Sequence, residues 1–301
     1  MQKEHHSSLS VPETILMALG NMRRSGFRHR LAYRKALAGK RIMILGNGPS
    51  LNADYEKFHD VVNEGDCMCV NRFAHAPLFT RIRPRYYILC DPAFCLPEEQ
   101  VGSGHLLDMR HQLFAEIITK LSWEMTLLLP SYARHNKPGS LPVHPLLHIR
   151  YFNNVKLNHR LPDWIKFPLL SANMACPSLR NVLIGALYCS INLGYERIIL
   201  MGADHSWFEQ IGVDQSNRVY VNDPHFNDPE NAGNPEKVFL FRDTEKKIPY
   251  RIADFFMDQV VVFRTYLELR AYAEKMGTSV QNAGTKSYID AFERIEFIPP
   301  A

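Results

Sequence analysis

The sequence predicts an α/β protein whose core is a Rossmann-like parallel sheet with helices on both faces. Three observations indicate this fold class. Short apolar runs alternate with longer helical patterns along most of the chain. The first apolar run, residues 42–45, leads directly into the glycine-rich turn GNGPS. Polar residues follow three later runs, where the carboxyl edge of a parallel sheet would hold a ligand.

The apolar runs are expected to form strands at 42–45, 66–70, 85–90, 125–129, 197–201 and 279–282. Helices are expected over residues 53–58, 106–121, 179–193 and 252–276. We expect Ser178 to be the N-cap of the helix over 179–193 and Gly194 to be its C-cap, while Gly277 ends the last helix.

Two regions lie outside this alternation. Residues 1–39 are expected to form a basic helical extension, because residues 14–37 combine an apolar face with a cluster of arginines. Such a helix could lie on anionic lipid, or it could pack on the rest of the protein. Residues 40–301 are expected to form one Rossmann-like domain. Within it, residues 205–250 are rich in Asn, Asp, Pro and Gly and are expected to be an irregular lid.

The composition is that of a soluble globular protein, with 46% hydrophobic and 22% charged residues. The net charge of +4 is too small to indicate nucleic-acid binding by itself. No apolar stretch reaches the roughly 18–20 residues of a membrane span, and the polar N-terminus is unlike a signal peptide. We therefore expect a cytoplasmic protein, whose basic extension could touch the inner membrane as a peripheral contact.

The cysteine pattern also suits a reducing compartment. None of the cysteines has a CxxC partner, and several lie inside apolar runs. We expect them to be buried, reduced thiols. They are Cys67, Cys69, Cys90, Cys95, Cys176 and Cys189.

The turn after the first strand consists of Gly46, Asn47, Gly48, Pro49 and Ser50. It is not a P-loop, because no Lys-Ser or Lys-Thr follows the glycines. It also fails to complete the dinucleotide fingerprint GxGxxG, since Leu51 occupies the third glycine position. Its backbone N–H groups, with the Asn47 amide and the Ser50 hydroxyl, could hold one phosphate and the edge of a sugar. The alternative is that these residues simply form a tight turn.

Polar side chains follow three other predicted strands. Asn71, Asp91 and Asp204 each lie at or just beyond the end of an apolar run. Because the carboxyl ends of parallel strands share one edge of the sheet, we expect these side chains to converge there with the glycine turn.

These features, in this order, resemble the bacterial lipooligosaccharide sialyltransferases. The resemblance rests on the turn GNGPSL, the strand ends at Asn71 and Asp91, and the block LGYERIILMGAD at residues 193–204. It covers residues 41–210, with a weaker part at 277–294. It extends to a broader superfamily that includes flagellin-modifying proteins and hydroxymethylpterin pyrophosphokinase-like proteins. The sialyltransferases use a CMP-activated nonulosonic sugar, and the resemblance implies the same class of donor here.

The resemblance also implies roles for individual residues. Asn47 and Ser50 would contact the CMP phosphate and ribose, and Asn71 would contact the nucleotide or the donor sugar. Asp91 occupies a position where the family has a donor-contacting asparagine, so the chain departs from the family pattern there.

Two further steps of the implied reaction need side chains. The family relieves the charge of the leaving phosphate with two tyrosines; Ser206 stands where the first would be, and Tyr220 could be the second. The acceptor hydroxyl needs a base that titrates near neutrality, which indicates histidine. His225, flanked by aspartates in the segment 205–250, is the first candidate, and His205 is the reserve candidate.

Together these features predict a sialyltransferase-like glycosyltransferase that moves a sugar from a CMP-activated donor to a cell-surface glycan or glycolipid acceptor. No metal or other cofactor is expected, because no two aspartates have the Asp-x-Asp spacing of metal-dependent transferases. The histidines and carboxylates of the predicted lid leave a metal site open as an alternative. Two other functions stay open, a pterin-type pyrophosphokinase using ATP and Mg²⁺ and a non-catalytic nucleotide-binding protein. No nucleic-acid partner is expected, and a homo-oligomer is a further open alternative.

Overall fold

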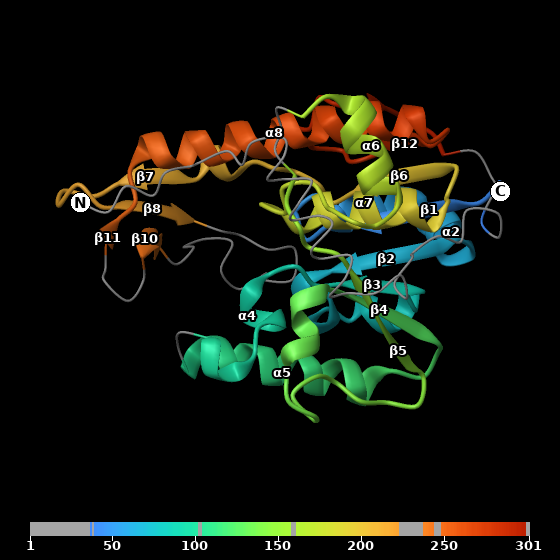
Figure 1. Cartoon of the computed structure of the whole chain (residues 1–301), viewed down its shortest axis with the longest axis horizontal. Helices are drawn as coiled ribbons and strands as arrows, with labels where there is room; N and C mark the ends of the chain where they lie inside the picture. Colours follow the sequence, from blue (N-terminus) through green and yellow to red (C-terminus); the bar gives the residue numbers. More distant parts are fainter. Residues whose placement is uncertain are drawn as a thin grey trace.

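The computed structural model describes residues 37, 39–101, 104–157, 161–222, 237–243 and 248–298. Within these ranges, one large sheet and the helices around it account for most of the secondary structure (Figure 1). No helix in this part of the chain is long and apolar enough to cross a lipid bilayer. The predicted helix over 14–37 lies outside the described residues, except for its last residue.

The central sheet has eight strands in the order β13-β12-β6-β1-β2-β3-β4-β5, and all neighbouring pairs are parallel. The strands are β1 (Arg41–Leu45), β2 (Asp66–Val70), β3 (Tyr86–Ile88), β4 (Met125–Pro130), β5 (Leu147–Phe152), β6 (Arg197–Met201), β12 (Ser279–Asn282) and β13 (Glu293–Arg294). The chain adds strands in one direction from β1 to β5, and then places β6 on the other side of β1. This reversal is the switch point at which open α/β sheets bind ligands. The predicted fold class is confirmed.

The side chains of β1 alternate between two hydrophobic cores. Ile42 and Ile44 belong to the core under α7 (Val182–Leu193) and α8 (Ile252–Lys275). Met43 and Leu45 belong to the core under α2 (Leu51–Glu64) and α5 (Gly104–Lys120). Figure 1 shows α8 along the top with α7 beneath it, and α5 on the opposite side. Because both faces are covered, residues 42–45 of β1 are all apolar instead of alternating with polar residues.

Most predicted strands and helices are confirmed close to their expected bounds. The predicted N-cap is wrong, because α7 begins at Val182 and the Asn181 side chain, not Ser178, accepts a hydrogen bond from Leu183 N at 2.8 Å. Gly194 is the C-cap, as predicted, with a φ of 94° that suits glycine. All of the cysteines are free and buried, which also agrees with the prediction.

Some elements were not predicted from the sequence. The shorter helices are α3 (Leu78–Ile82), α4 (Pro92–Cys95) and α6 (Asp163–Ser171). The periodic signal of α6 is weak because the helix contains Pro168. The edge strand β5 carries arginine and histidine between its apolar residues, so it lacks the continuous apolar run of the inner strands.

The segment 205–250 is less irregular than predicted. Its described parts include an antiparallel sheet of β7 (Ile211–Val213), β8 (Val219–Asn222) and β9 (Lys237–Phe239), and a hairpin of β10 (Phe241–Asp243) and β11 (Ile248–Pro249). These short strands lie within the segment that the sequence predicts to be irregular, and its role as a lid stays a prediction. The strands are too short to give a clear alternation in the sequence.

Candidate functional site

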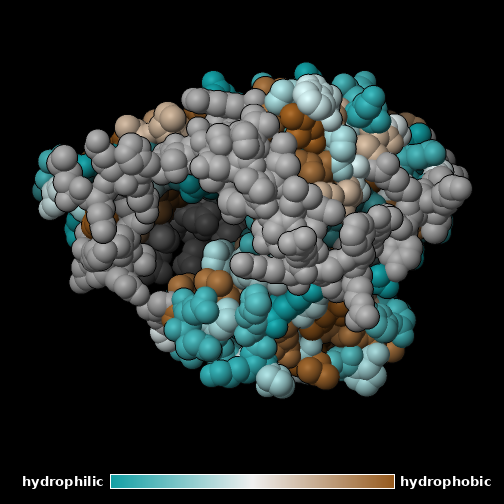
Figure 2. Space-filling model, viewed as in Figure 1, coloured by the Kyte–Doolittle hydropathy of each residue, from teal (hydrophilic) through white to brown (hydrophobic). Residues whose placement is uncertain are grey.

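A cavity of about 200 Å³ opens at the switch point, where the turns after β1 and β6 meet the start of α7. Of the predicted site residues, those that line it are Asn47, Gly48, Pro49, Asn71, Asp204 and His205. Gly46, Ser50, Asp91 and Tyr220 do not line it, and His225 lies outside the described residues. Figure 2 shows mostly hydrophilic residues, with smaller hydrophobic patches, on the lower part of the face in view, where α4 and α5 lie in Figure 1.

The glycine turn is joined to the turn after β6 by its own backbone. Gly46 N donates to Met201 O and Gly48 N donates to Gly202 O, both at 2.9 Å. A Cβ on Gly46 would lie 2.2 Å from Gly202 O, so glycine is required by the close approach of the two chains. These N–H groups are used inside the protein. The predicted phosphate grip by the backbone of this turn is therefore wrong for Gly46 and Gly48.

Ser50 holds a carboxylate instead of facing the cavity. Its hydroxyl donates to Asp204 Oδ1 at 2.6 Å, and its N–H donates to Asp204 Oδ2 at 3.1 Å. The same hydroxyl lies 3.2 Å from Oδ2 of the fully buried Asp54, which also accepts from Gly202 N. Burial raises the pKa of Asp204, and the negative charge of Asp54 raises it further. The hydrogen bonds from Ser50 lower this pKa but do not cancel the rise. Ser50 thus positions Asp204, and its predicted contact with a ligand finds no support in this geometry.

Asp204 explains why position 48 is glycine. A Cβ there would lie 2.2 Å from Asp204 Oδ1 and 2.8 Å from Gly202 O. Gly48→Ala should therefore lower the free energy of unfolding by about 1–3 kcal/mol, the usual range for overpacking. Gly104→Ala is the control, because a Cβ there meets nothing within 4 Å. Chemical denaturation measures both, and equal stability of the two variants would contradict this packing.

Two asparagines that line the cavity carry buried side-chain oxygens without a hydrogen-bond partner in the described part of the chain. Asn47 Nδ2 donates to Val70 O at 3.2 Å, which turns Asn47 Oδ1 away from that carbonyl. Neither Asn47 Oδ1 nor Asn71 Oδ1 has a hydrogen-bond partner among the described residues, although both atoms are buried. Buried polar atoms of this kind are rare and usually mark a missing partner. The wall formed by Asn47, Asn71 and Asp204 is therefore rich in acceptors and suited to a ligand that brings donors.

Another part of the cavity lining is the N-terminus of α7. Asn181, Val182 and Leu183 line the cavity there. A helix N-terminus favours negative charge because the helix dipole is positive at that end, while Leu183 N and Ile184 N already donate to Asn181 Oδ1 and Asn181 O at 2.8 and 3.2 Å. The prediction missed these residues, although an asparagine just before the apolar run VLIGALY is an N-cap signal.

His205 lies in an apolar environment. It is 5% exposed, its ring contacts Trp207 at a centroid distance of 4.4 Å, and its Nε2 lies 2.6 Å from Tyr266 Oη. Burial lowers the pKa of His205 to about 3 and raises the pKa of Tyr266. The hydrogen bond between His205 Nε2 and the Tyr266 hydroxyl therefore joins a neutral imidazole to a protonated phenol. A histidine with this pKa and an occupied Nε2 is poorly suited to be a general base near neutral pH, so the reserve role for His205 is revised.

Asp91 and Tyr220 serve the fold at some distance from the cavity lining. Asp91 caps α4, because its Oδ1 accepts a hydrogen bond from Ala93 N at 2.8 Å. Tyr220 lies on β8 and packs over Gly212 and against Phe239. Of the predicted polar groups at strand ends, those after β1, β2 and β6 converge, and the one after β3 does not.

No metal centre is apparent in the described part of the chain. There, no group of three or more His, Cys, Asp or Glu side chains is arranged to hold a metal ion. The aspartates that flank His225 in the sequence are outside these residues, so the alternative of a metal in that segment keeps its status as a prediction.

Comparison with known proteins gives a structural similarity. No family model matches the chain, and no curated protein matches it. The solved structure of MAf glycosyltransferase from Magnetospirillum magneticum AMB-1 is similar, with a TM-score of 0.45 and 11% sequence identity. The match covers 85% of this chain and 33% of that one, so the chain spans one third of that protein's length. A similarity of this size carries no conclusion about what the cavity binds, and membership of the sialyltransferase family stays a prediction.

Proposed function

We propose that the chain is a glycosyltransferase that binds a CMP-activated sugar at the switch-point cavity. The observation that carries the proposal is the pair of buried, unpaired acceptors, Asn47 Oδ1 and Asn71 Oδ1. A ribose has hydroxyl groups and a cytosine has an amine, and these groups can donate to such acceptors. A polar ligand that satisfies both oxygens removes the cost of leaving them unpaired.

The charge distribution supports one orientation of the nucleotide. The Asp204 carboxylate lies on the acceptor wall, where it would repel a phosphate that is not protonated. We therefore place the hydroxyl and amine groups against Asn47 and Asn71, and the phosphate toward the N-terminus of α7. The resemblance to the sialyltransferases led us to expect the phosphate on the glycine turn, and this proposal moves it to the N-terminus of α7.

The size of the cavity supports binding of part of the donor. Its volume of about 200 Å³ is below the roughly 300–1,000 Å³ of drug-sized ligand pockets. We place the nucleoside portion inside the cavity and the activated sugar outside it. The acceptor would be a glycan or glycolipid, and the reaction would need no divalent metal.

Ligand-induced stabilisation tests this proposal. CMP at a hundredfold excess over its Kd should raise the free energy of unfolding by about 2.7 kcal/mol. Asn47→Ala should lose most of this gain, because it removes one acceptor and the contact that holds Val70 O. Asn63→Ala is the control, since Asn63 is an exposed residue of α2 outside the cavity lining. Stabilisation by ATP with Mg²⁺ but none by CMP would contradict the proposal and favour a pyrophosphokinase.

A further inference from the structure

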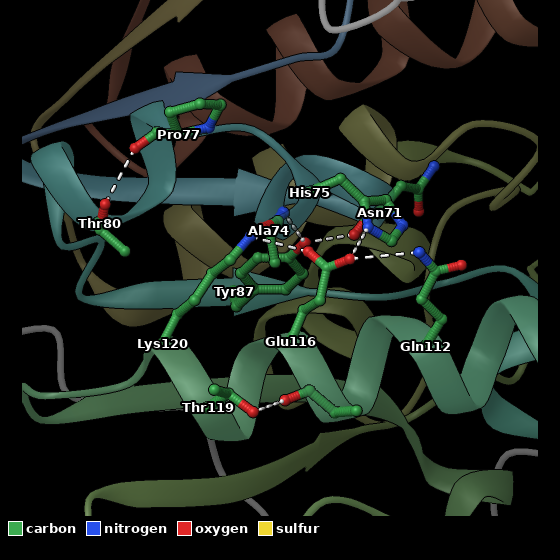
Figure 3. A network of polar contacts seen from close by, with 11 residues as sticks. Asn71, Ala74, His75, Pro77, Thr80, Tyr87, Gln112, Glu116, Thr119 and Lys120 are labelled. Atoms are coloured by element: carbon green, nitrogen blue, oxygen red, sulfur yellow. Dashed lines mark hydrogen bonds and ion pairs between the residues drawn. The ribbon is translucent and has the colours of Figure 1, made fainter.

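The turn that carries Asn71 is anchored from below by two elements. It is a 3₁₀ turn, Asn71–His75, that follows β2 directly. Figure 3 shows this turn resting on Tyr87 of β3 and on Glu116 and Lys120 of α5. The Asn71 side chain points away from these anchors in the same view. The backbone of the turn is thus held by Tyr87, Glu116 and Lys120, while the Asn71 side chain extends away from them.

Tyr87 makes the central contacts. It is fully buried, its hydroxyl accepts a hydrogen bond from Ala74 N at 2.9 Å, and it donates to Asn71 O. Burial raises the pKa of Tyr87, so the hydroxyl keeps the proton that it donates. The Tyr87 hydroxyl oxygen therefore bridges Asn71 O and Ala74 N, and it satisfies the hydrogen-bonding needs of both backbone groups.

The helix α5 secures the far end of the turn. Lys120 Nζ donates to Ala74 O at 2.6 Å and lies 2.8 Å from Glu116 Oε2. Glu116 Oε1 lies 2.8 Å from His75 Nδ1. These contacts fix His75 and Ala74, but none of them reaches Asn71. Among the anchors in Figure 3, Tyr87 is the residue that contacts Asn71 itself.

Asn71 needs such support because of its backbone conformation. Its φ is 47°, in the left-handed region that costs a residue with a side chain about 1 kcal/mol or more. The preceding carbonyl, Val70 O, is held by Asn47 Nδ2. Consecutive carbonyls are therefore each held by a side chain, Val70 O by Asn47 and Asn71 O by Tyr87. This arrangement sets the positions of both unpaired cavity acceptors before a ligand arrives.

We propose that Tyr87 is a positioning residue that holds Asn71 Oδ1 in place for the ligand, without touching the ligand itself. This inference rests on the proposed function, since it assumes that Asn71 contacts the bound nucleotide. Pre-organising an acceptor in this way improves affinity, because the cost of ordering the turn is met during folding.

The first arm of the test needs no ligand. In Tyr87→Phe, hydrogen exchange of the 71–76 backbone should be about tenfold faster than in the wild type, because Ala74 N loses its acceptor. Tyr188→Phe is the matched control, since Tyr188 is also fully buried and its hydroxyl contacts Leu170 O and Ala175 O. Unchanged exchange of the turn in Tyr87→Phe would overturn the inference. If Tyr87→Phe does not fold, the Ala74 amide of the wild type decides, because exchange as fast as that of an exposed amide would overturn its contact with Tyr87.

The second arm is a double-mutant cycle with CMP as the probe. Tyr87→Phe should weaken CMP binding by about three- to tenfold, and Asn71→Ala by about tenfold. In the Asn71→Ala background, Tyr87→Phe should have less than about a twofold further effect, because both act through the same oxygen. Additive effects would overturn the inference, as would equal weakening by Tyr188→Phe. If the wild type does not bind CMP, the proposed function fails, and the exchange arm alone decides the role of Tyr87.

Discussion

Lowering the pH from 7 to 5 should cost the protein about 2 kcal/mol of stability through His205 alone. Burial lowers the pKa of His205 to about 3 in the folded state, whereas an unfolded histidine has a pKa of about 6.5. The folded pKa is the lower one, so this stability is fully present above about pH 6.5. It is lost as the pH falls toward 3, because the unfolded chain takes up the proton first.

Urea unfolding of the wild type and of His205→Gln at both pH values measures this contribution. The variant should be less stable at pH 7, because it packs less well against Trp207 and Tyr266. Its loss between pH 7 and pH 5 should be smaller than that of the wild type by about 2 kcal/mol. His148→Gln is the control, because His148 is exposed. Parallel pH profiles of the wild type and His205→Gln would mean that His205 is not buried as described.

Replacing His225 by asparagine should lower the rate of sugar transfer by about 10²–10⁴-fold, the usual loss on removing a general base. The sequence makes His225 the first candidate for the base, and the environment of His205 strengthens that choice. His205 has a low pKa, and its Nε2 is already hydrogen-bonded to the Tyr266 hydroxyl, so it has little capacity to take a proton near neutral pH.

The assay should use a CMP-sugar donor and contain EDTA, because the proposed transfer needs no metal. CMP binding by His225→Asn should stay close to that of the wild type, which separates loss of the base from loss of the nucleotide site. If His205→Asn abolishes transfer and His225→Asn does not, the base is His205. Activity that disappears with EDTA and returns with Mg²⁺ or Mn²⁺ would instead indicate a metal-dependent reaction.

The residues at the carboxyl edge of the sheet could be predicted from the sequence, because local signals mark the end of each strand. Val70 ends an apolar run, so Asn71 had to lie at a strand end, and the same reasoning placed Asp204 beyond Met201. Residues at the carboxyl ends of neighbouring parallel strands share one edge whatever the details of packing. This argument correctly brought Asn47, Asn71 and Asp204 to one cavity.

The direction of each side chain could not be predicted in the same way. Ser50 faces Asp204 because the turns after β1 and β6 approach closely, a contact across 154 positions of sequence. His205 is buried by Phe263 and Tyr266, which lie on α8 far along the chain. The role of Asp91, in contrast, could have been predicted from local sequence. An aspartate before Pro-Ala is an N-cap signal, and this signal favours a capping role over a place in the cavity.

A crystal structure of the protein with CMP tests the central claim most directly. The account predicts CMP in the switch-point cavity, with ligand hydroxyl or amine groups about 2.7–3.0 Å from Asn47 Oδ1 and Asn71 Oδ1. It also predicts the phosphate beside the N-terminus of α7, away from Asp204. CMP bound elsewhere, or a phosphate seated on the glycine turn with both asparagine oxygens still unpaired, would contradict it.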